Sequence, residues 1–134
     1  MKAKKRFGQN FLTDKKLLED LISLINMSSQ DKFLEIGPGK GDLTENLINF
    51  CDCYFGIEVD RDLLTILKNR FPKNKKAFIN RDILKLNPSE IYPLNKFRVI
   101  GNIPYNISSP ILDWCEKNYE KILDVHFMLQ KEFA

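Results

Sequence analysis

The chain has 134 residues, of which 43% are hydrophobic and 29% are charged, and its formal net charge at pH 7 is +3. This length and composition are typical of one soluble globular domain and leave no room for a second. No apolar run approaches a membrane span, no secretory leader is visible, and the three cysteines lack the spacing of a disulfide framework or a zinc site, so we predict a cytoplasmic protein without a metal.

The N-terminal segment is basic and contains aromatic residues. Residues 1–16 carry six Lys or Arg side chains against a single Asp. Basic side chains interleaved with aromatic rings suit a phosphate backbone and unstacked bases. The candidate RNA-binding residues are Lys4, Lys5, Arg6, Phe7 and Phe11. A second basic cluster occupies 68–76, for which a solvated, lysine-rich surface is the alternative explanation.

The first half of the chain predicts a helix, a strand, a glycine turn and a second helix. Leucine and isoleucine recur at helical spacing from Leu17 to Ile25, and Thr13 is a candidate cap. The run 32–36 has the composition of a buried strand, and the sequence Gly-Pro-Gly-Lys-Gly follows it at 37–41. A glycine turn between a strand and a helix is a weak signal of nucleotide binding when it stands alone.

Two further predicted strands end near acidic side chains. The strand 53–57 is followed by Glu58, about 20 residues beyond the first glycine, where a carboxylate can accept both ribose hydroxyls. The strand predicted at 76–80 ends near Asp82, which is suited to an adenine amino group. Each of the two acids has an alternative explanation as a surface charge at a strand end or as a helix cap. Together with Gly37 and Gly39 they suit an adenosine.

The sequence Asn-Ile-Pro-Tyr at 102–105 follows a short predicted strand, 98–100, after which Gly101 is expected to let the backbone turn. The side-chain carbonyl of Asn102 and a nearby backbone carbonyl are suited to accept the two protons of a planar amino nitrogen. Pro104 stiffens this segment, and Tyr105 offers a ring on which a base can stack. An ordinary Asn-Pro-Tyr loop is the alternative. An adenosine site beside a group that orients nitrogen favours S-adenosylmethionine as the cofactor.

The last predicted elements are a helix and a strand. Ser108 is a candidate cap for a helix with Pro110 in its first turn, and Ile111, Leu112 and Cys115 are expected to face the sheet. The strand at 125–129 contains His126, the only histidine, which we interpret as structural. Strands that alternate with helices predict an α/β fold with a mostly parallel sheet covered on both faces.

These motifs, in this order, resemble the KsgA-type adenine dimethyltransferases of small-subunit rRNA. The resemblance rests on three segments, 5–12, 35–41 and 102–110, together with 127–132. It implies a Rossmann-like class I methyltransferase fold, S-adenosylmethionine as cofactor, and rRNA as partner of a monomeric enzyme. It implies that the residues lining the cofactor pocket are Asn10, Leu12, Gly37, Gly39, Glu58, Asp82 and Asn102, and that Asn102, Pro104 and Tyr105 act on the target base.

The family transfers two methyl groups to each of two adjacent adenines in a hairpin loop, which requires each base to leave its stack. The family's domain continues with more strands and a small helical domain, so residues 1–134 are expected to form an incomplete methyltransferase domain. Three alternatives stay open: a large-subunit methyltransferase of the erythromycin-resistance type, a fragment that binds cofactor or RNA without turnover, and an enzyme for DNA adenine or protein glutamine.

Overall fold

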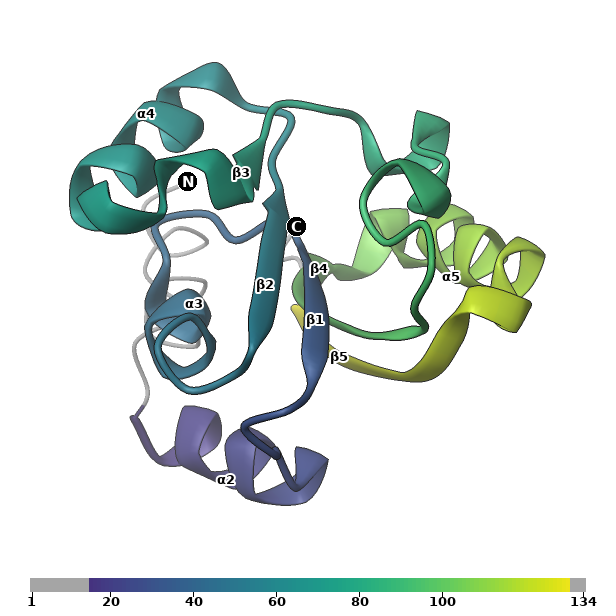
Figure 1. The fold of residues 1–134 in the computed structure, drawn as a ribbon, viewed down its shortest axis with the longest axis horizontal. Coiled ribbons are helices and arrows are strands. Elements are labelled where there is room, and N and C mark those ends of the chain that lie inside the picture. Colours follow the sequence, from purple (N-terminus) through teal and green to yellow (C-terminus); the bar gives the residue numbers. More distant parts are fainter. Residues whose placement is uncertain (1–14, 131–134) are drawn as a thin grey trace.

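A parallel five-stranded sheet forms the centre of the protein in the computed structural model, which describes residues 15–130 (Figure 1). The strand order is β3-β2-β1-β4-β5, and every neighbouring pair is parallel. The strands are β1 (Lys32–Ile36), β2 (Cys53–Ile57), β3 (Phe78–Ile79), β4 (Phe97–Pro104) and β5 (Ile122–Gln130). The predicted α/β class with a parallel sheet is therefore confirmed.

Helices cover both faces of this sheet. They are α2 (Lys15–Ile25), α3 (Asp42–Leu47), α4 (Arg61–Arg70) and α5 (Ser108–Lys117). One apolar cluster joins α2, α3 and α4 to the sheet through residues such as Ile25, Leu47 and Leu67. The other joins α5 to the opposite face through Ile111 and Trp114. Between residues 15 and 130, the connections also contain short 3₁₀ segments at Pro72–Ala77, Ile83–Lys85, Pro88–Glu90, Tyr105–Ile107 and Tyr119–Lys121.

Local sequence accounts for where these elements begin. The helix α4 starts directly after Asp60, because the Asp60 carboxylate accepts hydrogen bonds from the backbone N–H groups of Asp62 and Leu63. The strand β1 is buried along almost its whole length, as expected for a central strand of a parallel sheet. Thr13, the candidate cap of α2, lies outside the described residues.

The third strand is shorter than predicted, and the fifth is longer. The predicted strand 76–80 is reduced to Phe78–Ile79, because a 3₁₀ turn that Pro72 begins continues through Ala77. Only Phe78 and Ile79 then pair with β2. The strand β5 begins at Ile122, three residues before the predicted start at Val125, because Ile122 and Asp124 already pair with β4.

The prediction that the backbone turns at Gly101 is wrong. The strand β4 continues through it to Pro104, with Gly101 between Ile36 of β1 and Phe127 of β5. A Cβ atom at this position would lie 2.9 Å from the carbonyl oxygen of Ile36. Glycine is therefore required here for the close approach of two strands.

The start and the buried face of α5 also differ in part from the prediction. Ser108 is the first helical residue rather than the cap, and its hydroxyl donates to the carbonyl of Tyr105 at 2.8 Å. Pro110 lies in the first turn as expected. Leu112 is exposed, whereas Trp114 is buried and donates its indole N–H to the carbonyl of Leu86. The face of α5 that packs against the sheet therefore contains Ile111, Trp114 and Cys115, and not Leu112.

The order of the strands determines where a ligand can bind. The chain moves from β1 outward to β2 and β3, and then returns to the other side of β1 for β4 and β5. The carboxyl ends of β1 and β4 therefore lie side by side where the direction of winding reverses. Open α/β sheets bind ligands in the crevice at such a point.

Within residues 15–130, no helix is long and apolar enough to cross a membrane. The same part of the chain contains no cluster of three or more His, Cys, Asp or Glu side chains that could hold a metal ion.

Candidate functional site

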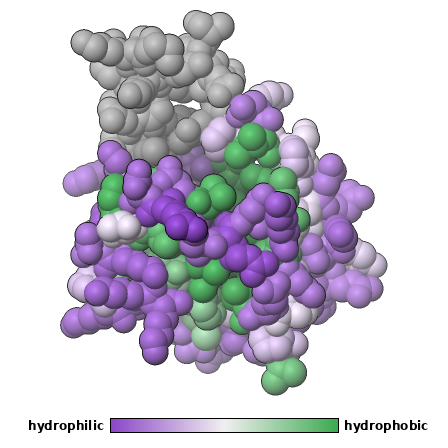
Figure 2. Space-filling view, turned by 90° about the horizontal axis from the view of Figure 1, so that it is seen from above, coloured by the Kyte–Doolittle hydropathy of each residue, from purple (hydrophilic) through white to green (hydrophobic). Residues whose placement is uncertain are grey.

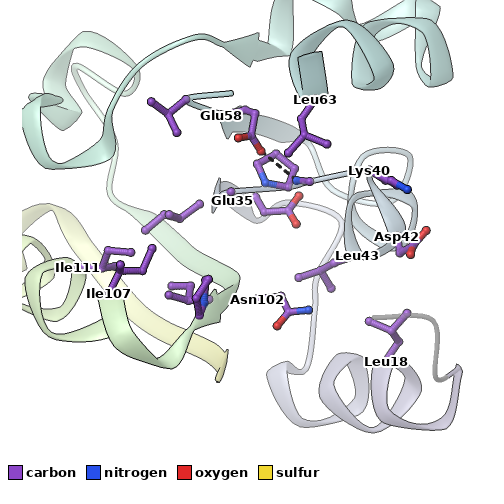
Figure 3. Close-up of a pocket in the computed structure, with 17 residues that line it drawn as sticks. Leu18, Glu35, Lys40, Asp42, Leu43, Glu58, Leu63, Asn102, Ile107 and Ile111 are labelled. Atoms are coloured by element: carbon purple, nitrogen blue, oxygen red, sulfur yellow. Dashed lines mark hydrogen bonds between the residues drawn. The ribbon is translucent and has the colours of Figure 1, made fainter. Parts of the chain in front are cut away.

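A cavity of about 700 Å³ opens at the carboxyl ends of β1, β2 and β4 (Figure 3). Its size falls within the range of small-molecule sites, about 300–1,000 Å³. Its walls combine apolar side chains from α2, α3 and α5 with the glycine turn, two glutamates and one asparagine amide. Seen from above, apolar residues gather in the middle of the surface between polar regions (Figure 2).

The glycine turn after β1 presents bare backbone to this cavity. Gly37 and Gly39 both have φ of 63°, a left-handed conformation that other residues adopt only with strain. Apart from its two chain neighbours, no atom of the described residues lies within 4 Å of where a Cβ would stand at Gly37. Gly41, with φ of 97°, is required for a further reason, because a Cβ there would lie 2.7 Å from the Phe71 ring. The predicted glycine turn between β1 and α3 is therefore present.

Glu58 ties the end of β2 to the glycine turn. One carboxylate oxygen accepts from the backbone N–H of Gly39 at 3.0 Å, and the other accepts from Asp60 N–H at 3.1 Å. The residue is only 4% exposed, and it lines the cavity. Carboxylate oxygens have lone pairs beyond these two contacts, so Glu58 can still accept hydrogen bonds from a ligand's hydroxyl groups.

Asn102 faces the cavity from the end of β4, as Figure 3 shows. Both its amide nitrogen and its amide oxygen are buried, and neither has a hydrogen-bond partner within the described residues. A buried amide left unsatisfied costs about 1–3 kcal/mol. The amide nitrogen is therefore available to donate, and the amide oxygen to accept, a hydrogen bond with a bound molecule.

Glu35, which the sequence reasoning did not single out, lies on the same wall. It is 1% exposed, and one of its carboxylate oxygens accepts from the hydroxyls of Thr44 and Tyr54. Burial raises the pKa of Glu35 to about 7, even though these two donors favour the charged form. The signal that could have found it is an acidic residue inside the apolar strand 32–36, where a charged side chain is rarely placed without a reason.

The remaining predicted site residues are less closely associated with the cavity. Asp82 does not line it; instead its carboxylate caps the 3₁₀ turn Ile83–Lys85 by accepting from Leu84 N–H at 3.0 Å. The strand β3 ends at Ile79, which leaves two residues between the strand and Asp82. Pro104 lines the cavity, whereas Tyr105 does not and is 63% exposed. Two residues predicted to line the cofactor pocket, Asn10 and Leu12, lie outside the described residues. So do all five candidate RNA-binding residues.

The arrangement has a definite chemical character. Bare backbone and the Glu58 carboxylate suit a polar, hydroxyl-bearing group at one side of the cavity. The buried Glu35 carboxyl suits a cation, because a positive charge in the cavity would favour its ionised form. The Asn102 amide can donate one hydrogen bond through its nitrogen and accept another through its oxygen, so it suits a planar polar group with both a donor and an acceptor. The cavity therefore fits a ligand that carries a sugar and a positive charge beside a second, amino-bearing molecule.

Comparison with known protein families gives one match over the whole chain. The family model described as ribosomal RNA adenine dimethylase matches residues 1–134. The ribosomal RNA small subunit methyltransferase A of Methylobacillus flagellatus is 45% identical over 130 residues, which cover 97% of this chain and 50% of that protein. The protein of the same name from Coxiella burnetii is 41% identical over 133 residues, covering 98% and 52%. The chain thus spans about half the length of these curated relatives.

Solved structures agree with this result. The 23S rRNA methyltransferase ErmE superposes with a TM-score of 0.70 at 30% identity, over 84% of this chain and 45% of that one. A dimethyladenosine transferase from Plasmodium falciparum gives a TM-score of 0.61 at 27% identity, over 77% and 37%. A magnesium protoporphyrin IX methyltransferase from Synechocystis, solved with bound SAM, gives 0.58 at 16% identity over 85% and 56%, a likeness of fold alone.

Proposed function

The chain belongs to the ribosomal RNA adenine dimethylase family, and from this premise we propose that it is the methyltransferase part of an enzyme that dimethylates two adjacent adenines in a hairpin of small-subunit rRNA. Its domain, residues 1–134, is proposed to be incomplete, with the last strands and a helical RNA-binding domain lying beyond it. The names of the relatives with 41–45% identity support the small-subunit substrate.

The observation that carries the proposal is the unsatisfied amide of Asn102. Its oxygen and nitrogen are buried without partners at the edge of a cavity of about 700 Å³. An amino nitrogen of adenine is a poor nucleophile because its lone pair is delocalised into the ring. A carbonyl oxygen that accepts one N–H proton orients this lone pair and stabilises the charge that develops on the nitrogen. Asn102 is placed to do this.

The described cofactor-binding candidates fit S-adenosylmethionine. The bare backbone at Gly37 and Gly39 leaves room for a ligand to approach closely, and Glu58 would accept hydrogen bonds from the ribose hydroxyls. Glu35 would pair with the ammonium group of the methionine part. Asp82 is retained as a proposed adenine contact, with Asn10 and Leu12 completing the pocket. When bound, the cofactor supplies a methyl group made electrophilic by its sulfonium.

The segment after Asn102 would hold the target base. The backbone carbonyl of Ile103 or Pro104 is proposed as the acceptor for the second N–H, and Pro104 restricts the backbone that aims it. Tyr105, with its exposed ring, would stack on a base that has left the RNA helix, a contact of about 1–3 kcal/mol. The basic residues Lys4, Lys5 and Arg6, with Phe7 and Phe11, are proposed to contact the RNA. We place the enzyme in the cytoplasm as a monomer.

Methyl transfer from labelled S-adenosylmethionine tests this proposal. Wild type should label small-subunit rRNA, whereas Asn102→Ala should lose at least about 100-fold in rate, the usual cost of removing one group that stabilises developing charge. Asn106→Ala is the matched control, because Asn106 is exposed, does not line the cavity and should keep wild-type activity.

The choice of substrate separates the alternatives. Labelling of large-subunit rRNA in preference to small-subunit rRNA would favour the erythromycin-resistance type, which the likeness to ErmE supports. Labelling of duplex DNA would remove rRNA as the substrate. Binding of the cofactor by calorimetry without any transfer would identify the chain as a binding fragment.

A further inference from the structure

We propose that Tyr54 is a positioning residue, which acts with Thr44 to hold the Glu35 carboxylate toward the cavity for the ammonium group of the cofactor. This inference rests on the proposed function, since it takes a sulfonium amino acid as the ligand. It adds a role for a side chain that does not itself line the cavity.

Two hydroxyl groups hold the same oxygen of Glu35. The Tyr54 hydroxyl donates to Oε1 at 2.5 Å, and the Thr44 hydroxyl donates to it at 2.6 Å. All three residues are buried, with exposed fractions of 6% for Tyr54, 0% for Thr44 and 1% for Glu35. The second oxygen, Oε2, accepts no hydrogen bond within the described residues. The carboxylate is thus fixed through one oxygen, and its other oxygen remains available to a ligand.

The packing around Tyr54 indicates that its hydroxyl, rather than its ring alone, is required. In the sheet Glu35 pairs with Gly56, two residues after Tyr54, so the tyrosine reaches along β2 past Gly56 to contact Glu35. A Cβ atom at Gly56 would lie 2.6 Å from the Tyr54 hydroxyl oxygen. A phenylalanine ring would pack against Phe78 in the same way, but it would offer Glu35 no donor.

The charged groups around Glu35 make this donor important. Glu58, from the end of β2, raises the pKa of Glu35 further, while Lys40 and Asp42 from the glycine turn and the start of α3 line the same cavity. Asn102 from β4 and Leu18 from α2 bring no charge. Burial has already raised the pKa of Glu35 to about 7, and the two hydroxyl donors oppose that rise. Without Tyr54's hydroxyl, the pKa of Glu35 would rise further, and Glu35 would bind a cation more weakly at neutral pH.

Calorimetric titration of the full chain with two ligands tests the inference. S-adenosylmethionine carries the ammonium group, whereas 5′-methylthioadenosine keeps the adenosine and lacks the amino-acid part. At pH 7, Tyr54→Phe should weaken S-adenosylmethionine about 3- to 10-fold, as expected for the loss of one ordinary intramolecular hydrogen bond, and should leave 5′-methylthioadenosine within twofold. The ratio of wild-type to variant affinity should shrink as the pH rises from 6 to about 7.5, because Glu35 then ionises more fully in both proteins while the α-amino group of the ligand keeps its proton.

Two further variants make the result specific. Thr44→Val removes the other donor and should act in the same direction. In a Glu35→Gln background, Tyr54→Phe should cause no further selective loss of S-adenosylmethionine. Equal losses for both ligands at every pH would overturn the inference, since they indicate a purely structural tyrosine, and so would an unchanged affinity for S-adenosylmethionine. Failure of the wild type to bind either ligand would instead overturn the proposed function, and the inference with it.

Discussion

Glu35 carries a carboxyl group in an otherwise apolar part of β1, and burial raises its pKa from the ordinary value of 4.5 to about 7. In the unfolded chain this group loses its proton near pH 4.5, whereas in the folded chain it keeps the proton until about pH 7. Because the raised pKa belongs to an acid, the folded state becomes less stable as the pH rises through this window. The full effect is about 3 kcal/mol above pH 7.

Replacing Glu35 by glutamine should therefore stabilise the ligand-free protein at high pH. The amide oxygen can still accept from Thr44 and Tyr54, but no charge is left to be desolvated. We expect Glu35→Gln to exceed wild type by up to about 3 kcal/mol at pH 8 and by little at pH 4, as measured by urea unfolding. A variant less stable than wild type at pH 8 would contradict the assignment of burial as the cause.

Single residues also show what a sequence can and cannot predict about a site. Glu58 directly follows β2, and Asn102 lies near the carboxyl end of β4. Because parallel strands end at one edge of a sheet, the proximity of these two residues could be inferred. An acid within the apolar strand 32–36 could have drawn attention to Glu35, but its two hydrogen-bond donors could not be predicted, because Tyr54 and Thr44 reach it only after the sheet and α3 have packed. Asp82 was expected at a strand end, but β3 ends at Ile79, and its carboxylate caps a turn instead.

The strand β2 illustrates how an element accommodates a functional contact. Gly56 is the only glycine of this strand, and a Cβ there would lie 2.6 Å from the Tyr54 hydroxyl, 3.0 Å from Pro38 and 3.1 Å from Phe78. Glycine at position 56 therefore leaves the space through which the Tyr54 side chain reaches Glu35, although a glycine weakens the strand.

Gly56→Ala should destabilise the protein by about 1–3 kcal/mol through overpacking. Part of this loss should be recovered when Tyr54→Phe removes the hydroxyl that the new methyl group meets, and thermal unfolding of the two single variants and the double variant measures the coupling. Gly101→Ala is the control, because its Cβ would meet the backbone oxygen of Ile36 at 2.9 Å, which Tyr54→Phe cannot relieve. Strictly additive effects at Gly56 would contradict the predicted clash.

At the scale of the whole molecule, Arg98 joins segments that are distant in sequence. Its guanidinium donates to the carboxylates of Asp31 and Asp124 and to the carbonyl of Ile25, so that one side chain links α2, the turn before β1, and β5. It also lies 5.2 Å from the centre of the Phe33 ring. The side chain is only 10% exposed, so water screens these charged contacts little.

We expect Arg98→Met to cost about 2–4 kcal/mol, because it removes the guanidinium that pairs with both the Asp31 and the Asp124 carboxylates. Arg70→Met is a close control: Arg70 also contacts two carboxylates, Asp42 and Glu45, and lies over an aromatic ring, but it is 34% exposed. Its loss should cost less than about 1 kcal/mol. Equal destabilisation of the two variants in denaturant would show that burial does not set the strength of the Arg98 contacts.

The sequence by itself determined the alternation of strands and helices, the glycine turn and the placement of Asn102 near the carboxyl end of a strand. These depend on apolar periodicity, on capping residues such as Asp60 and on the conformations open to glycine, all of which act over a few residues. The tertiary structure alone decided that Glu35 is a buried acid with two donors, that Gly101 lies within a strand, and that Asp82 caps a turn. Strand register and burial arise from contacts between residues far apart in the chain, and no local pattern encodes them.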